Sequence, residues 1–432
     1  MAVLTEGSAA GLPVVTDATA GPSGAVTRGS VVRVGAATAL SALCGYAVLY
    51  LAARDLEPAG FSVFGVFWGA FGLASGAAFG LLQETTREVR SLDRRRADPE
   101  GERTHPLRIA TGVGLAAAAL IALTSPLWSA HVFVEDRLLS VALLSVGLAG
   151  FCLHTTLLGA LAGVDRWSEY GALMVTDAVL RVTVAAATFA VGWGLGGYLW
   201  ATVAGSIAWL LMMLASPATR AAARLRAPGG TMTFLRGAGH SIAAAGASAV
   251  LVMGFPVLLK ATSGGDLGAA GGVVILAVTL TRAPLLVPLT AMQGNLIAHF
   301  VDQRSHRLRA LIVPAAVVGA LGVVGVAAAG MFGPWLLQAA FGAEYVADGV
   351  LLAWFTAAAV AIALLTLTGA ATVAAALHRG YAAGWLSATV ASALLLLLPL
   401  DLEVRTVVAL LCGPLLGMAV HLVALARVPA AG

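Results

Sequence analysis

The chain has 432 residues, of which 59% are hydrophobic and only 11% are charged, and its mean hydropathy is +0.93. A soluble domain cannot bury that much apolar surface, so the composition excludes a soluble protein and predicts an all-α membrane protein. The formal net charge of +4 does not indicate a nucleic-acid partner, because the arginines lie between long apolar stretches and are suited to contact anionic membrane lipids.

Residues 1–30 are rich in Ala, Gly, Thr and Ser, a composition typical of a disordered cytoplasmic tail. Twelve apolar stretches follow, each about 20 residues long, which is the length that a helix needs to cross the hydrocarbon core of a bilayer. The predicted spans are 31–53, 60–82, 107–126, 139–163, 171–192, 194–215, 238–260, 271–297, 310–333, 347–376, 382–400 and 405–427.

The positive charges predict the orientation of these spans. Most of the 25 Lys and Arg residues lie in the two tails or in loops that follow even-numbered spans. The loops on the opposite side contain only Arg54, Arg137, Lys260 and Arg405. Because cytoplasmic loops carry the excess of positive charge, we expect a multi-pass plasma-membrane protein with both termini in the cytoplasm.

Six spans precede a basic loop and six follow it. The sequence therefore predicts an N-terminal six-helix lobe over 31–215, a cytoplasmic linker over 216–237 and a C-terminal six-helix lobe over 238–432. Transporters built from such repeats hold their substrate between the two halves.

The second predicted span carries a regular series of glycines, spaced four, three, four and four residues apart. They are Gly65, Gly69, Gly72, Gly76 and Gly80. This spacing keeps all of them on one face of a helix, where small residues let another backbone approach closely. We favour tight helix packing over a binding role for this face.

Two arginines lie within predicted spans, where an unpaired charge is costly. Arg181 has a local partner, because Asp177 lies one helical turn earlier on the same face. Two interpretations stay open with equal weight: a structural ion pair that permits insertion, or a pair with a role in a cavity.

Arg282 has no acid within its own span. This pattern favours a water-filled cavity with an anionic ligand, since guanidinium is a bidentate donor for phosphate. The alternative is a carboxylate from another span, for which Asp177 is the candidate. Arg33 and Lys260 are candidates to face the same cavity from its two ends.

The sequence lacks the motifs that would indicate an enzyme. There is no Gly-rich phosphate loop of the P-loop kind, no HExxH motif and no Ser-His-Asp arrangement on a water-facing segment. The three cysteines lie within predicted spans and have no metal-ligand spacing. We therefore expect no cofactor and no metal, and transport is the default function.

Residues 53–64, which read Ala-Arg-Asp-Leu-Glu-Pro-Ala-Gly-Phe-Ser-Val-Phe, resemble a segment of polysaccharide-exporting flippases, R-x-L-G-P-x-x-F/Y-G-x-F/Y. These are the Wzx-like members of the multidrug/oligosaccharidyl-lipid/polysaccharide (MOP) exporter superfamily. The chain departs from the segment at Glu57 and Ser62, where glycine is usual. Shorter similarities follow in order at 157–167, 281–284 and 341–345.

The resemblance implies a MATE-like, V-shaped pair of six-helix lobes around a cationic cavity. It implies that the protein moves an undecaprenyl-diphosphate-linked oligosaccharide to the outer leaflet by alternating access, without ATP. Carried over to this chain, Arg282 and Arg33 would meet the diphosphate, Arg181 is a weaker candidate, and Arg54 would fix the outer turn. The implied partners are this anionic cargo, membrane lipids and the glycan polymerase machinery.

Two other functions stay open. The first is an ion-coupled multidrug exporter of the same fold, which needs an acid in the cavity, and Asp177 is the candidate. The second is a membrane component of a glycan assembly complex that does not itself transport.

Overall fold

The computed structural model describes residues 28–91, 102–292, 296, 299–301, 303 and 307–427, so the predicted tail lies almost wholly outside the described residues. Within them the chain is almost entirely helical. The elements are α1 (Arg28–Arg90), β1 (Arg103–Thr104), α2 (Pro106–Val132), α3 (Arg137–Gly163), α4 (Trp167–Val191), α5 (Leu195–Ala204), a short 3-10 helix (Gly205–Ile207), α6 (Ala208–Ala215), α7 (Pro217–Ala223), β2 (Ala227–Pro228), α8 (Thr231–Val252), α9 (Phe255–Thr262), α10 (Gly268–Ala291), α12 (Arg307–Phe341), α13 (Gly349–Ala374), α14 (His378–Leu396) and α15 (Leu402–Ala426).

The predicted all-α membrane fold is confirmed. In the described part of the chain, nine helices are long and apolar enough to cross a membrane, and the bent pair of α8 and α9 makes a tenth candidate. Helix α1 counts once in this number although it contains the first two predicted spans, and α14 occupies the remaining one. The end of the predicted span 271–297 lies largely outside the described residues.

Helix α1 consists of two helices joined at a kink. Glu57 has φ 54° and ψ 174°, a conformation that glycine adopts readily and other residues rarely do. Pro58 follows and has no N–H to continue the helical hydrogen bonds. The kink therefore lies at the position where the flippase segment usually has glycine, and it turns the chain back across the membrane.

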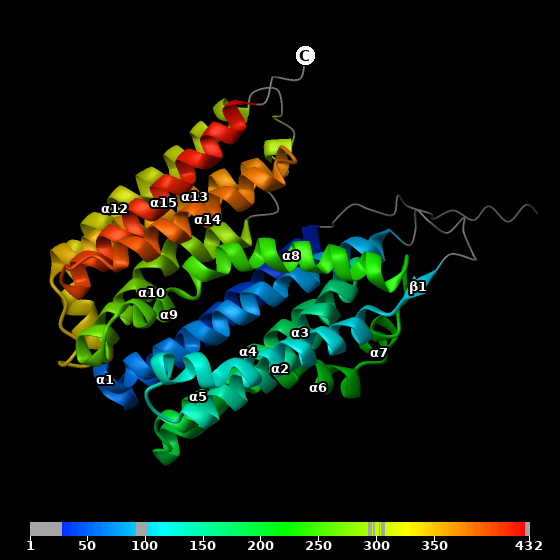
Figure 1. Ribbon diagram of the computed structural model, residues 1–432, viewed down its shortest axis with the longest axis horizontal. Helices are drawn as coiled ribbons and strands as arrows, with labels where there is room; N and C mark the ends of the chain where they lie inside the picture. The colour runs from blue at the N-terminus through cyan, green and yellow to red at the C-terminus, as the bar shows by residue number, and fades with distance from the viewer. Residues whose placement is uncertain are drawn as a thin grey trace, which may run out of the picture.

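The helices form two arms that meet at one end and diverge at the other (Figure 1). One arm holds α2 to α7 with α1, which packs on α3 and α4; the other holds α12 to α15. Helices α8 and α10 both pack against α1 and so join the two arms. The predicted lobe boundaries at residues 215 and 238 stay a prediction.

The glycine face of α1 is the seam along which the two arms meet. A Cβ atom added at each glycine would contact a residue of the second half of the chain. The pairs are Gly65 with Ile275, Gly69 with Pro256, Gly72 with Met253, Gly76 with Ala249, and Gly80 with the backbone of Ile242. The predicted packing face is thus confirmed, and its partners are α8, α9 and α10.

Candidate functional site

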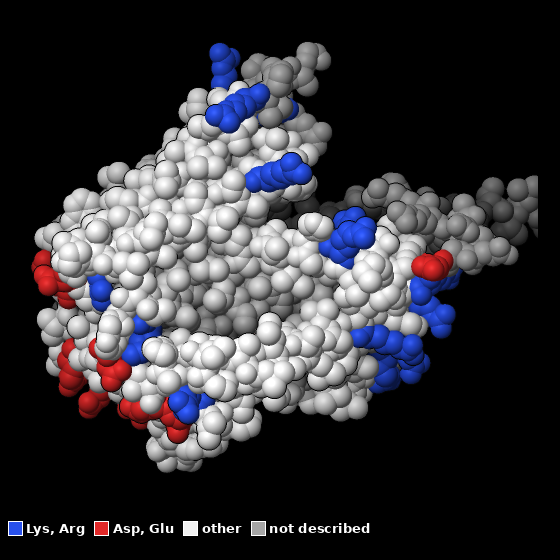
Figure 2. Space-filling view, viewed as in Figure 1, with Lys and Arg blue, Asp and Glu red and all other residues white. Residues whose placement is uncertain are grey.

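A hollow opens between the two arms on the side where they diverge (Figure 2). Arginines gather around its open end, and acidic residues gather at the end where the arms meet. The ends of elements at the open side carry Arg87, Arg90, Arg103, Arg108, Arg309, Arg379 and Arg427. The closed side carries Glu57, Glu135, Asp136, Asp266, Glu344, Asp348, Asp401 and Glu403. This distribution agrees with the charge asymmetry of the sequence.

Arg282 of α10 is buried where α8 ends. It is 7% exposed, and its Nη1 donates to the carbonyl oxygens of Leu251 at 3.3 Å and Val252 at 3.2 Å. These residues end α8, where carbonyls lack helical donors, and α9 continues after a bend of 66°. The guanidinium carbon lies 5.3 Å from the centre of the Phe255 ring.

Among the described residues, no carboxylate neutralises the charge of Arg282. No salt bridge joins it to any acid among the described residues, and its Nη2 atom is buried there without a hydrogen-bond partner. The Tyr46 hydroxyl of α1 lies within electrostatic range, so the side chain of Arg282 lies on the side of α10 that faces α1. The expected alternative partner, Asp177, is engaged elsewhere.

Asp177 and Arg181 of α4 form the predicted ion pair. The Nε and Nη2 atoms of Arg181 each donate to one carboxylate oxygen at 3.0 Å. Its Nη1 atom donates to the carbonyl of Thr202, and its guanidinium lies 5.2 Å from the centre of the Phe71 ring. His154, buried and stacked on a neighbouring ring, lies within electrostatic range of the pair. Both members of the pair are therefore fully engaged within the first arm.

Arg33 lies apart from these residues, exposed at the open end of the hollow. Its Nη1 atom donates to the hydroxyl of Ser168 at 2.9 Å, at the start of α4. Roughly 20 Å of helix separate Arg33 from Tyr46, the neighbour of Arg282. The structure thus places the three predicted substrate-binding arginines at three separate positions: the mouth, the first arm and the α8–α9 break.

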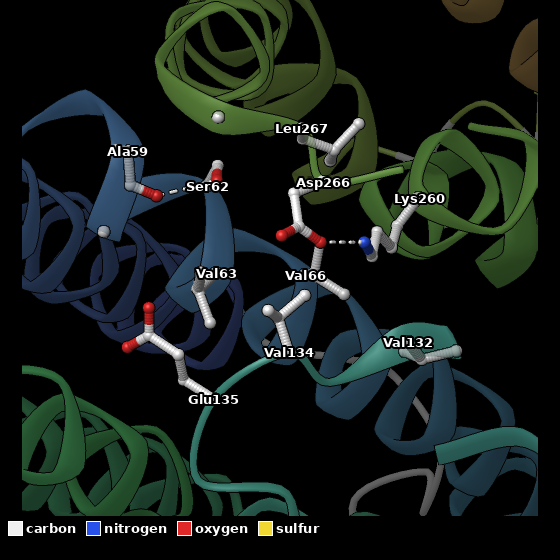
Figure 3. A pocket seen from close by; sticks show the side chains of 12 residues that line it. Ala59, Ser62, Val63, Val66, Val132, Val134, Glu135, Lys260, Asp266 and Leu267 are labelled. Carbon is white, nitrogen blue, oxygen red and sulfur yellow. Dashed lines mark hydrogen bonds and ion pairs between the residues drawn. The ribbon is translucent and has the colours of Figure 1, made fainter. Parts of the chain in front are cut away.

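Lys260 lies at the closed end, beside a pocket of about 190 Å³ between α1, the α2–α3 loop and the α9–α10 loop (Figure 3). Its ammonium group donates to Asp266 at 3.0 Å and to the carbonyl of Gly265 at 3.1 Å. Glu135 lines the same pocket from the first arm. The sequence indicated Lys260 but gave no signal for its partner, because Asp266 lies in a loop with no fixed helical spacing.

Two tyrosines hold the kink of α1 at the closed end. Tyr198 of α5 donates to the carbonyl of Leu51 at 3.2 Å, and Tyr345, between α12 and α13, donates to the carbonyl of Ala53 at 2.9 Å. Burial, together with the charges of Glu344 and Glu57, raises the pKa of Tyr345, so its phenol keeps the proton that it donates. The Nη1 of Arg54, expected to fix this turn, lies beside Gly342 of the same loop. Side chains from both arms therefore form hydrogen bonds with one short segment of α1, Leu51 to Ala53.

Known proteins similar to this chain fall into two groups. No protein-family model matches it. It is 70% identical over 426 residues to an uncharacterized protein of Mycobacterium bovis, with 99% of this chain and 98% of that protein covered. A second uncharacterized protein, from Mycobacterium tuberculosis H37Rv, is 69% identical over 412 residues, with 95% of each chain covered.

The solved structures that it resembles are more distant in sequence. A multidrug resistance MATE family transporter of the MOP superfamily, in an inward-facing conformation, superposes with a TM-score of 0.66 at 16% identity, covering 92% of this chain and 98% of that one. A MOP superfamily transporter from Pyrococcus furiosus, described by the reverse polarity of its binding pocket, gives 0.63 at 15% identity, covering 92% and 95%. The chain belongs to the family of these mycobacterial proteins, and its fold is that of the MOP superfamily transporters.

Proposed function

We propose that this protein is a plasma-membrane transporter that moves an anionic, undecaprenyl-diphosphate-linked oligosaccharide from the inner to the outer leaflet by alternating access. Three features support the proposal: the MOP fold, a hollow open at the arginine-rich end, and the flippase-like segment at the kink of α1. With both termini in the cytoplasm, the hollow opens toward the cytoplasm.

The observation that carries the choice of an anionic cargo is the environment of Arg282. A guanidinium that is 7% exposed and has no carboxylate partner among the described residues is unusual in a membrane protein. Its Nη1 atom donates to two backbone carbonyls, while Nη2 has no hydrogen-bond partner among the described residues. A phosphate oxygen at Nη2 would satisfy it by a charge-assisted hydrogen bond.

The positions of the other arginines suggest an order of events. Arg33, exposed at the mouth, would meet the diphosphate first, and Arg282 would hold it deeper between the arms. Arg181 stays the weaker candidate because Asp177 already takes two of its nitrogens. The polyprenyl chain would stay in lipid while the arms rock, and the exported unit would then reach the glycan polymerase machinery.

The test is a comparison of two arginines that both hold helix-terminal carbonyls. Arg220 donates to the carbonyls of Met213 and Leu214 at 2.8 and 3.0 Å at the end of α6, away from the hollow. In proteoliposomes, we expect Arg282→Gln to slow the flipping of a lipid-linked oligosaccharide about tenfold or more, and Arg220→Gln to leave it unchanged. Equal rates for wild type and a folded Arg282→Gln protein would contradict the proposal.

The same preparation separates the other two functions. Asp177 is the candidate acid for an ion-coupled drug exporter, and it is bound to Arg181. Export of organic cations that disappears in Asp177→Asn would favour the multidrug exporter. Absence of flipping by the purified wild type, restored by a glycan assembly partner, would favour the non-transporting component.

A further inference from the structure

A groove of about 600 Å³ lies between α2 and α8 at the arginine-rich end of the molecule. Its lining changes character along its length. The mouth has Arg103, His105 and Arg108, and the rest is apolar, from Ile109 to Ala116 on α2 with Leu235 on α8. Arg103 and Arg108 are among the arginines of the open side, but the proposed function gives neither of them, nor any other residue of the groove, a role in holding the cargo.

The mouth of the groove is built by both halves of the chain. Strand β1 pairs with β2, which sets Arg103 opposite Pro228 and Thr104 opposite Ala227. The hydroxyls of Thr104 and Thr231 lie 3.2 Å apart and tie the start of α8 to the strand before α2. Thr104 and Ala227 are buried, so this end of the groove has a fixed frame.

The two arginines of the mouth are available to a ligand. Arg103 and Arg108 are both exposed, and in the described ranges neither side chain has a hydrogen bond or an ion pair. Two free cations at one opening, with a histidine between them, favour an anion with several oxygen acceptors. A phosphate group has this chemistry.

The apolar part of the groove identifies the rest of the ligand. Arg108 lies in the first turn of α2, and the groove continues about 12 Å along the helix to Ala116, toward the hydrocarbon core. Gly112 forms a furrow, since an added Cβ would meet no atom within 4 Å. Outside the groove lining, α2 exposes Leu115, Leu120 and Leu123 by 61%, 64% and 80%, as a lipid-facing helix does.

We infer that this α2–α8 groove binds an anionic phospholipid of the surrounding leaflet. Its phosphate lies between Arg103 and Arg108, and one acyl chain follows the furrow at Gly112. Because α2 comes from the first half of the chain and α8 from the second, the lipid contacts both halves and stabilises the arrangement in which the groove exists. This inference does not depend on the proposed cargo.

The experiment uses the full-length protein in nanodiscs with equal parts of phosphatidylglycerol and phosphatidylcholine, and native mass spectrometry to identify retained lipids. We expect wild type to retain phosphatidylglycerol selectively, and Arg103→Gln/Arg108→Gln to reduce that selectivity about tenfold. Arg379→Gln/Arg427→Gln is the matched control, since it removes two exposed arginines at the same side of the other arm. It should retain the wild-type selectivity.

A second variant tests the furrow with both arginines present. Gly112→Phe places a ring in the empty space and should abolish retention of the lipid, whereas Leu120→Phe, on the lipid-facing surface of the same helix, should not. Equal retention of the two lipids by wild type would overturn the inference. So would the same loss in the control pair, or displacement of phosphatidylglycerol by added undecaprenyl diphosphate, which would make the groove a cargo site.

Discussion

The hydroxyl of Tyr345 donates a hydrogen bond of 2.9 Å to the carbonyl oxygen of Ala53, and it joins the α12–α13 loop to the kink of α1. The tyrosine ring also packs edge-on against Phe61, just after the kink. Two of the segments that resemble flippase sequences, 53–64 and 341–345, therefore meet at the closed end of the molecule.

Removing this hydroxyl should destabilise the protein. Tyr345→Phe leaves a buried carbonyl without its donor, and we expect a loss of about 1–3 kcal/mol in the free energy of unfolding. Thermal unfolding of the purified protein measures the effect. Tyr50→Phe is the control, because Tyr50 packs on Phe341 nearby but is 44% exposed. If both variants unfold at the same temperature, the hydrogen bond of Tyr345 does not contribute to stability.

Replacing Glu57 with glycine should stabilise the protein. A side chain at φ 54° and ψ 174° is strained by about 1–3 kcal/mol, and glycine relieves that strain. We expect Glu57→Gly to unfold at a higher temperature than wild type. Glu57→Gln keeps the Cβ atom and therefore the strain, so it should unfold at the wild-type temperature. Gln83→Gly, in the regular part of α1, should instead lower stability by about 1 kcal/mol. A drop for Glu57→Gly as well would mean that the kink is not strained.

Two glycines of α1, one in the glycine seam and one outside it, predict opposite effects of alanine substitution. At Gly80 an added methyl group would overlap the backbone of Ile242, so Gly80→Ala should cost about 1–3 kcal/mol through overpacking. At Gly45 nothing lies within 4 Å, so Gly45→Ala should gain up to about 1 kcal/mol from helix propensity. Chemical unfolding of both variants gives the comparison, and a neutral Gly80→Ala would show that the arms separate easily along the seam.

The sequence predicted the features that depend on local spacing. Bilayer thickness fixes span length, so twelve apolar stretches were enough to predict the membrane fold. Helical periodicity placed five glycines on one face and put Asp177 one turn before Arg181. In each of these cases the partners lie on the same helix or the face has a regular period.

The features that the sequence did not predict involve backbone partners and distant segments. Arg282 is held by backbone carbonyls of α8. Every residue has a backbone carbonyl, so the sequence does not reveal which residues provide these partners. The partners Tyr345 and Ala53 are 292 residues apart. The α2–α8 groove depends on the pairing of two two-residue strands, which no periodicity indicates.

Single and double variants of the Asp177–Arg181 pair can show whether the pair has a structural or a functional role. Their side chains are only 18% and 12% exposed, so removing one partner leaves a largely buried charge, at a cost of about 3–5 kcal/mol. We expect Asp177→Asn and Arg181→Gln each to lower the unfolding temperature strongly. The double variant should recover most of the loss, because neither charge is then left unpaired.

Flipping by the double variant then decides between the two interpretations of this pair. If the pair serves only insertion and packing, the stable double variant should flip a lipid-linked oligosaccharide at the wild-type rate. A folded double variant that no longer flips the lipid-linked oligosaccharide would show that the pair takes part in transport. If the flipping rate changes with the proton or sodium gradient in wild type and not in the variant, Asp177 is the coupling group. The bidentate geometry, with both carboxylate oxygens taken at 3.0 Å, favours the first outcome.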